Sequence, residues 1–122
     1  MLSHPTPGDD EPEHIKTIRK LFNAKLPEQM ATLDASWTGL SAGDDASVQD
    51  AIRGMFRVAH DISGTAEAFG GARLGDAAAA LAGKLRPYRD GSPTPSTESI
   101  EEVGRLVEGL KQSASDYLME WP

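Results

Sequence analysis

Apolar residues recur three and four positions apart along almost the whole chain, and this spacing constrains the fold more than any other feature. Such periodicity is typical of helices that bury one face, and no segment shows the period-two alternation of a strand. The spacing predicts a short helix near residues 13–25, a second near 27–41, a long third that ends at Gly70-Gly71, a fourth that ends at Pro87 and a last over Ile100–Trp121. We therefore expect an all-α protein, an antiparallel four-helix bundle with an additional short N-terminal helix.

Proline-rich segments set the expected boundaries of this bundle. Residues 1–12 combine three prolines with three acidic residues and one glycine, so we predict a disordered N-terminal tail followed by a bundle domain over residues 13–122. Residues 87–97 hold three more prolines and are predicted to form a loop. A chain of 122 residues suffices for one domain and is too short for two ordinary ones.

The charge and the missing residue types exclude several functions. A net charge of −7 disfavours binding to nucleic acid or to anionic lipid, because like charges repel. The absence of cysteine excludes disulfides, thiolate zinc sites and cysteine nucleophiles. No apolar run approaches the roughly 20 residues that span a bilayer, and the N-terminus lacks the pattern of a signal peptide. We expect a cytoplasmic protein without a membrane contact.

Of the three histidines, His60 has the most informative setting. His4 lies in the predicted tail and His14 lies beside acidic residues, so both are expected to be solvated surface residues. When Ala59 is placed at the centre of the apolar face of the long helix, His60 lies about 100° away around the helix axis. The imidazole is therefore expected at the edge of the core, with its base packed and its tip open.

One helical turn from His60 lie Phe56, Arg57, Ser63 and Gly64. A glycine inside a helix costs about 1 kcal/mol relative to alanine. Gly64 is explained if another molecule approaches the imidazole closely. The simpler alternative, that Gly64 relieves packing and His60 is an ordinary boundary residue, stays open on geometry alone.

The run from Ala59 to Gly70 resembles the signature of histidine-phosphotransfer (HPt) domains. That signature is a histidine followed at fixed spacings by an aliphatic residue, a glycine, small residues, a hydrophobic residue with a glycine, and a further aliphatic residue. The matching positions are His60, Ile62, Gly64, Thr65, Ala66, Phe69, Gly70 and Leu74. Upstream, Leu26-Pro27-Glu28-Gln29-Met30 with Leu33 and Trp37 is similar to the preceding helix of the family. The resemblance covers about residues 13–118.

The resemblance implies that His60 carries a phosphoryl group between receiver domains of response regulators, in a relay with a hybrid histidine kinase. Phe56, Gly64, Glu67 and the nearby arginines would then border the docking surface. No cofactor is expected on this chain, since the Mg²⁺ would belong to the partner receiver domain. The sequence has no glycine-rich nucleotide-binding loop, so we expect a monomeric carrier rather than an enzyme.

One position departs from the family pattern. HPt domains usually carry lysine or arginine three residues after the histidine, and this chain has Ser63 there. Arg57 and Arg53, one and two turns before His60, are the candidates for the missing positive charge. An alternative is a degenerate bundle that docks a receiver or kinase without being phosphorylated. A metal-holding bundle is a third reading, but Glu11-Pro12-Glu13-His14 is a single copy of the required Glu-x-x-His pattern.

Overall fold

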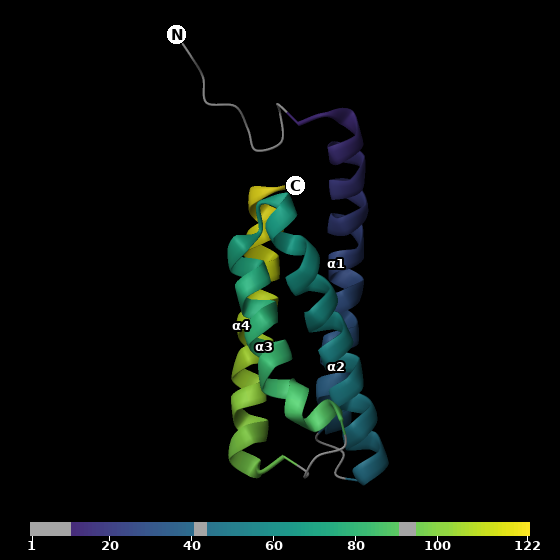
Figure 1. Ribbon diagram of the computed structural model, residues 1–122, viewed down its shortest axis with the longest axis vertical. Coiled ribbons are helices and arrows are strands. Elements are labelled where there is room, and N and C mark those ends of the chain that lie inside the picture. Colours follow the sequence, from purple (N-terminus) through teal and green to yellow (C-terminus); the bar gives the residue numbers. More distant parts are fainter. Residues whose placement is uncertain (1–10, 41–43, 91–94) are drawn as a thin grey trace.

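The computed structural model describes residues 11–40, 44–90 and 95–122. Its elements are α1 (Glu13–Leu40), α2 (Asp45–Thr65), the 3₁₀ turn η1 (Ala66–Phe69), α3 (Ala72–Arg89) and α4 (Thr97–Glu120). The helices run alternately down and up, so that the start of α1 and the C-terminus lie at the same end (Figure 1). No strand occurs in the described part of the chain, and the all-α bundle is confirmed.

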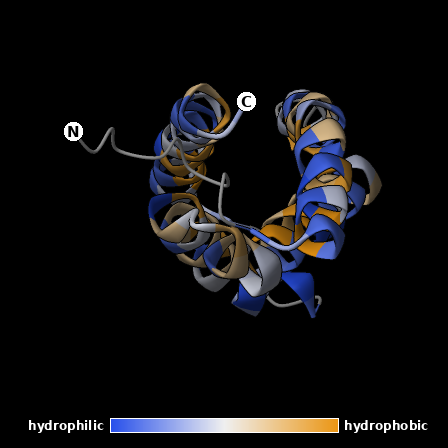
Figure 2. Cartoon of the chain, turned by 90° about the horizontal axis from the view of Figure 1, so that it is seen from above, coloured by the Kyte–Doolittle hydropathy of each residue, from blue (hydrophilic) through white to orange (hydrophobic). Residues whose placement is uncertain are grey.

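The core lies between the four helices. Seen from the end of the bundle, the hydrophobic stretches lie mainly on the sides of the helices that face inward (Figure 2). The largest fully buried side chains come from all four helices: Leu26, Leu33, Ile52, Met55, Ile62, Leu74, Leu81, Leu85, Val103, Val107 and Leu110. Burial of this apolar surface is the main force that holds the helices together.

The predicted separate N-terminal helix is wrong, because α1 is one continuous helix through Pro27. A proline removes one backbone hydrogen bond and normally kinks or breaks a helix. Here Pro27 is exposed, so water can solvate the carbonyl group that loses its partner. Leu26 and Leu33 are both fully buried, and their packing keeps the two halves on one axis.

The fourth helix also runs further than predicted, since α3 passes Pro87 and ends at Arg89. Its end is held from outside: the Gln49 side chain of α2 donates hydrogen bonds to the carbonyl oxygens of Tyr88 and Arg89, at 3.0 and 3.3 Å. The predicted loop over residues 87–97 is therefore shorter at its start. Residues 91–94 of that loop lie outside the described residues.

The long third helix ends earlier than predicted, because its last turn tightens into η1. The corner that follows turns on Gly70, whose φ of 82° lies in the left-handed region that favours glycine. The indole of Trp121 packs where a side chain at Gly70 would project, with its Cζ2 atom 2.7 Å from that position. Glycine is required here on both counts, and the corner returns the chain as α3.

Side-chain N-caps begin two of the helices, α2 and α4. The Asp44 carboxylate accepts a hydrogen bond from the Ser47 amide at 2.9 Å, and the Ser96 hydroxyl accepts one from the Ser99 amide at 3.1 Å. Such caps satisfy amide groups that have no partner inside the helix. None of the described helices is both long and apolar enough to cross a membrane.

Candidate functional site

His60 lies on the outward side of α2, where helical geometry predicts it. Ala59 and Ile62 on either side are fully buried, whereas His60 is exposed. The imidazole stacks on the ring of Phe56, with 5.6 Å between the ring centroids and 10° between the planes. Phe56 is itself only 7% exposed, so it is anchored in the core. The packed base and open tip predicted for His60 are both present.

A shallow depression of about 380 Å³ opens beside the imidazole. Its lining includes four of the seven predicted site residues, His60, Phe56, Arg53 and Arg57, together with Asp61, Arg89 and Asp90. Arg53 and Arg57 are exposed and have no hydrogen-bond or ion-pair partner among the residues the structure describes. Their guanidinium groups are therefore free to bind an anion.

Sequence reasoning missed the two arginines that α3 adds to this surface. The guanidinium carbon of Arg89 lies 4.5 Å from the centroid of the Phe56 ring, and that of Arg86 lies 5.9 Å away. Both distances are within the range of cation–π contacts. A hairpin turned at Gly70-Gly71 places residues equally far from the turn opposite each other. This pairing of α2 with α3 could have placed Arg86 and Arg89 near Phe56 from the sequence.

The other predicted site residues lie on the following turns. Ser63 donates a hydrogen bond from its hydroxyl to the His60 carbonyl oxygen at 2.9 Å, so the side chain folds back on its own helix. Gly64 is exposed, and no atom lies within 4 Å of the position a Cβ would take. Glu67 is exposed on η1 and does not line the depression. Gly64 thus leaves open space one turn from His60 and relieves no crowding in this structure.

Other candidate sites gain no support. His14 is exposed, and the described residues contain no group of three histidine or acidic side chains that could hold a metal ion. His4 and most of the predicted tail, residues 1–10, lie outside the described part of the chain.

The sequence model of the Hpt domain matches residues 12–113, which is most of the chain. The chain belongs to the Hpt domain family. Hpt domains are histidine-phosphotransfer carriers of two-component phosphorelays, not kinases, and they interact with receiver domains and kinases. No curated protein and no solved structure matches the chain significantly.

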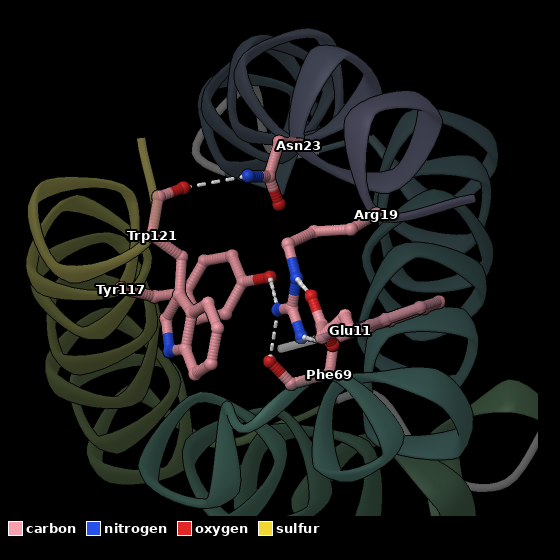
Figure 3. Close-up of polar contacts among 6 residues, drawn as sticks. All are labelled: Glu11, Arg19, Asn23, Phe69, Tyr117 and Trp121. Atoms are coloured by element: carbon pink, nitrogen blue, oxygen red, sulfur yellow. Dashed lines mark hydrogen bonds and ion pairs between the residues drawn. The ribbon is translucent and has the colours of Figure 1, made fainter. Parts of the chain in front are cut away.

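A second polar cluster of this Hpt domain lies at the end of the bundle that holds the start of α1 and the C-terminus, centred on Arg19 of α1 (Figure 3). Arg19 is 7% exposed, and its guanidinium binds the Glu11 carboxylate through Nε at 2.9 Å and Nη2 at 2.6 Å. Its Nη1 donates to the Tyr117 hydroxyl at 3.1 Å and to the Phe69 carbonyl. The indole of Trp121 lies 3.8 Å from the guanidinium carbon. Every nitrogen of this buried cation therefore has a partner, as burial of a charge requires.

The ionisable groups of the Arg19 cluster shift one another's pKa values. Hydrogen bonds from Arg19 lower the pKa of Glu11, and the same bonds raise the pKa of Arg19. Burial raises the pKa of Tyr117, against the opposing effect of Arg19. Glu11, which was assigned to the predicted tail, thus holds a charged contact to the bundle.

Proposed function

We propose that this Hpt domain accepts a phosphoryl group on His60 from the aspartyl phosphate of a receiver domain and passes it to another receiver domain. The observation that supports this most directly is the exposed imidazole of His60, stacked on a core-anchored ring beside the open surface at Gly64. A hybrid histidine kinase is the expected source of the phosphoryl group. A monomer that meets its partners in the cytoplasm suits this role.

The transfer needs a positioned nucleophile and little else from this chain. A nitrogen of the neutral His60 imidazole attacks the phosphorus in line, so that an N–P bond forms while the P–O bond to the aspartyl carboxylate breaks and the carboxylate leaves. Stacking on Phe56 restricts the ring and so reduces the entropy lost on alignment. The return step to the next receiver reverses these bond changes.

Positive charge near His60 is expected to offset the charge on the phosphoryl oxygens. Arg53 and Arg57 line the same depression and have no competing partner among the described residues. The same arginines would repel a divalent cation, so we assign Mg²⁺ to the partner receiver domain and no cofactor to this chain.

The receiver is proposed to dock on the surface around Phe56, Gly64 and Glu67. Gly64→Phe should abolish transfer, because the new ring would stand one turn from the imidazole, while the helix content should stay intact since the site is open. Gly109→Phe on α4, an equally open glycine, is the matched control and should leave transfer unchanged. Normal transfer by Gly64→Phe would place the docking surface elsewhere.

The test of function is transfer from a panel of receiver domains, each labelled with ³²P on its aspartate. Acid-labile label is expected on the wild-type protein and not on His60→Gln. Label on His60→Gln would overturn the assignment. The lack of charge at Ser63, whose hydroxyl is bonded to the His60 carbonyl, favours one alternative, a module that binds receivers without being phosphorylated. Stable receiver binding with no label on the wild type would establish that alternative.

A further inference from the structure

We propose that Arg89, on the helix opposite His60, supplies the positive charge to phosphorylated His60 that Ser63 cannot supply. This inference rests on the proposed function, since it concerns the same phosphoryl group. The Ser63 side chain carries no charge, and its hydroxyl proton is directed to the His60 carbonyl oxygen. A replacement must therefore come from elsewhere on the same surface.

Arg89 is placed for this by contacts on both its backbone and its side chain. Its carbonyl oxygen accepts a hydrogen bond from Gln49 of α2, which holds the end of α3 against the phosphoacceptor helix. Its guanidinium lies over Phe56, the same ring on which His60 stacks. Arg89 and His60 also line one depression. An anion bound to the imidazole would thus lie in the same depression as a guanidinium that is already partly positioned.

The other arginines are less well prepared. Arg53 and Arg57 are exposed without partners among the described residues, so each would lose its full side-chain freedom on binding a phosphoryl group. Arg86 lies 5.9 Å from the Phe56 centroid, near the outer limit of a cation–π contact. Arg89 has the shorter contact at 4.5 Å and is half-buried.

The current partner of Arg89 is easily exchanged. Its Nε binds the neighbouring Asp90 carboxylate at 3.0 Å, and its Nη2 lies 3.4 Å from the second oxygen. Because Asp90 is 66% exposed, solvent screens this pair. A phosphoryl group offers a planar guanidinium two acceptor oxygens and a higher charge than a carboxylate. Asp90 therefore binds Arg89 in the unphosphorylated protein, and the phosphoryl group replaces Asp90 as the partner of Arg89 when His60 is phosphorylated.

The test phosphorylates the intact protein with phosphoramidate, a small-molecule donor, so that no receiver is needed. Arg89→Gln should shorten the lifetime of the His60 phosphate by about two- to fivefold, the size of an exposed charge pair. It should also raise the pKa of the phosphoryl group in a ³¹P NMR titration, because a nearby cation favours the dianion. Arg89→Lys should restore most of both effects, and Asp90→Asn should lengthen the lifetime.

Arg105→Gln, an equal charge change at an exposed position on α4, is the matched control and should alter neither quantity. If Arg89→Gln leaves both the lifetime and the ³¹P titration unchanged, Arg89 is not the stabilising group and the inference is wrong. If the wild-type protein gains no phosphate on His60 that His60→Gln lacks, the proposed function fails, and this inference fails with it.

Discussion

Two regions of this Hpt domain, the Arg19 cluster and the surface around His60, use arginine in opposite ways. Arg19 is buried, and its guanidinium is shared among the N-terminal segment, η1 and α4. Arg57 near His60 is exposed and has no partner in the described part of the chain. A buried cation in which every nitrogen has a partner holds elements together, whereas an exposed cation with free donors is available to a ligand. Arginine thus has a structural role in the Arg19 cluster and, as we propose, a chemical role on the outer face of α2.

The residues of the family signature also fall into two groups, one on the exposed face around His60 and one with a structural role. His60 and Gly64 lie on the open face, and Ile62 lies in the core. Phe69 and Gly70 belong to the corner: the Phe69 ring packs 5.2 Å from Phe22, and Gly70 makes the left-handed turn. A short sequence pattern therefore encodes both a candidate reactive residue and the turn that returns the chain as α3.

The largest effect on stability is expected from Arg19→Met. The substitution leaves the Phe69 carbonyl and the Tyr117 hydroxyl without their donor and strips Glu11 of its partner. We expect a loss of about 2–3 kcal/mol in the free energy of unfolding, somewhat below a fully buried pair because Glu11 can turn to solvent. Urea unfolding measures it, with Lys20→Met on the exposed face of α1 as the control. If Arg19→Met lowers the free energy of unfolding no more than Lys20→Met does, the Arg19 cluster has no structural role that an exposed cation lacks.

Alanine at two glycines should change stability in opposite directions. Gly70→Ala forces a side chain into a left-handed conformation and against the Trp121 indole, which should cost about 2 kcal/mol. Gly64→Ala meets open space in a helix, which should stabilise the protein by about 0.5 kcal/mol. Thermal unfolding of the two variants checks the sign of each change. Equal destabilisation by the two substitutions would show that a side chain is tolerated no better at Gly64 than at Gly70.

Acid should weaken the Arg19 cluster through Glu11. The pKa of Glu11 in the folded protein lies below its ordinary value of 4.5, so its contribution is complete above that pH and is lost as the pH falls through the folded pKa. Glu11→Gln should therefore lower stability at neutral pH and flatten its decline below about pH 4.5. Glu102→Gln, which breaks a more exposed pair with Lys84, should have the smaller effect. Unfolding free energies measured between pH 3 and pH 7 test this, and identical pH dependence in the two variants would show that the partly buried Arg19–Glu11 pair contributes no more than the exposed one.

A modest gain in phosphorylation is expected from Ser63→Lys. A lysine there lies one turn from His60 and should raise the yield or lifetime of the phosphorylated form several-fold at most, because an exposed charge pair is worth at most about 1 kcal/mol. Removal of Arg89 should do more harm in the natural protein than in the lysine variant, and removal of Arg57 or Arg53 should show a smaller coupling of the same sign. A double-mutant cycle on the transfer rate from one receiver measures the coupling. Strict additivity would show that none of the three arginines substitutes for the missing lysine.

Local patterns were enough to predict the helical bundle and the exposed edge position of His60. They wrongly predicted that helices end at Pro27 and Pro87. Buried neighbours stabilise α1 through Pro27, and hydrogen bonds from Gln49 stabilise the end of α3 beyond Pro87. Arg89 was missed because its contact with Phe56 depends on how two helices pair. The hydrogen bond from Arg19 to Tyr117 joins residues 98 positions apart, and no local signal marks such a contact.

The position of the phosphoryl group among the three histidines tests the central claim most directly. The wild-type protein would be phosphorylated by a labelled receiver domain and examined by ¹H–³¹P correlation NMR, which couples phosphorus to the ring protons of the modified imidazole. We predict one modified histidine, with a signal that His60→Gln removes and His14→Gln leaves unchanged. A phosphoryl signal that survives in His60→Gln would contradict the account.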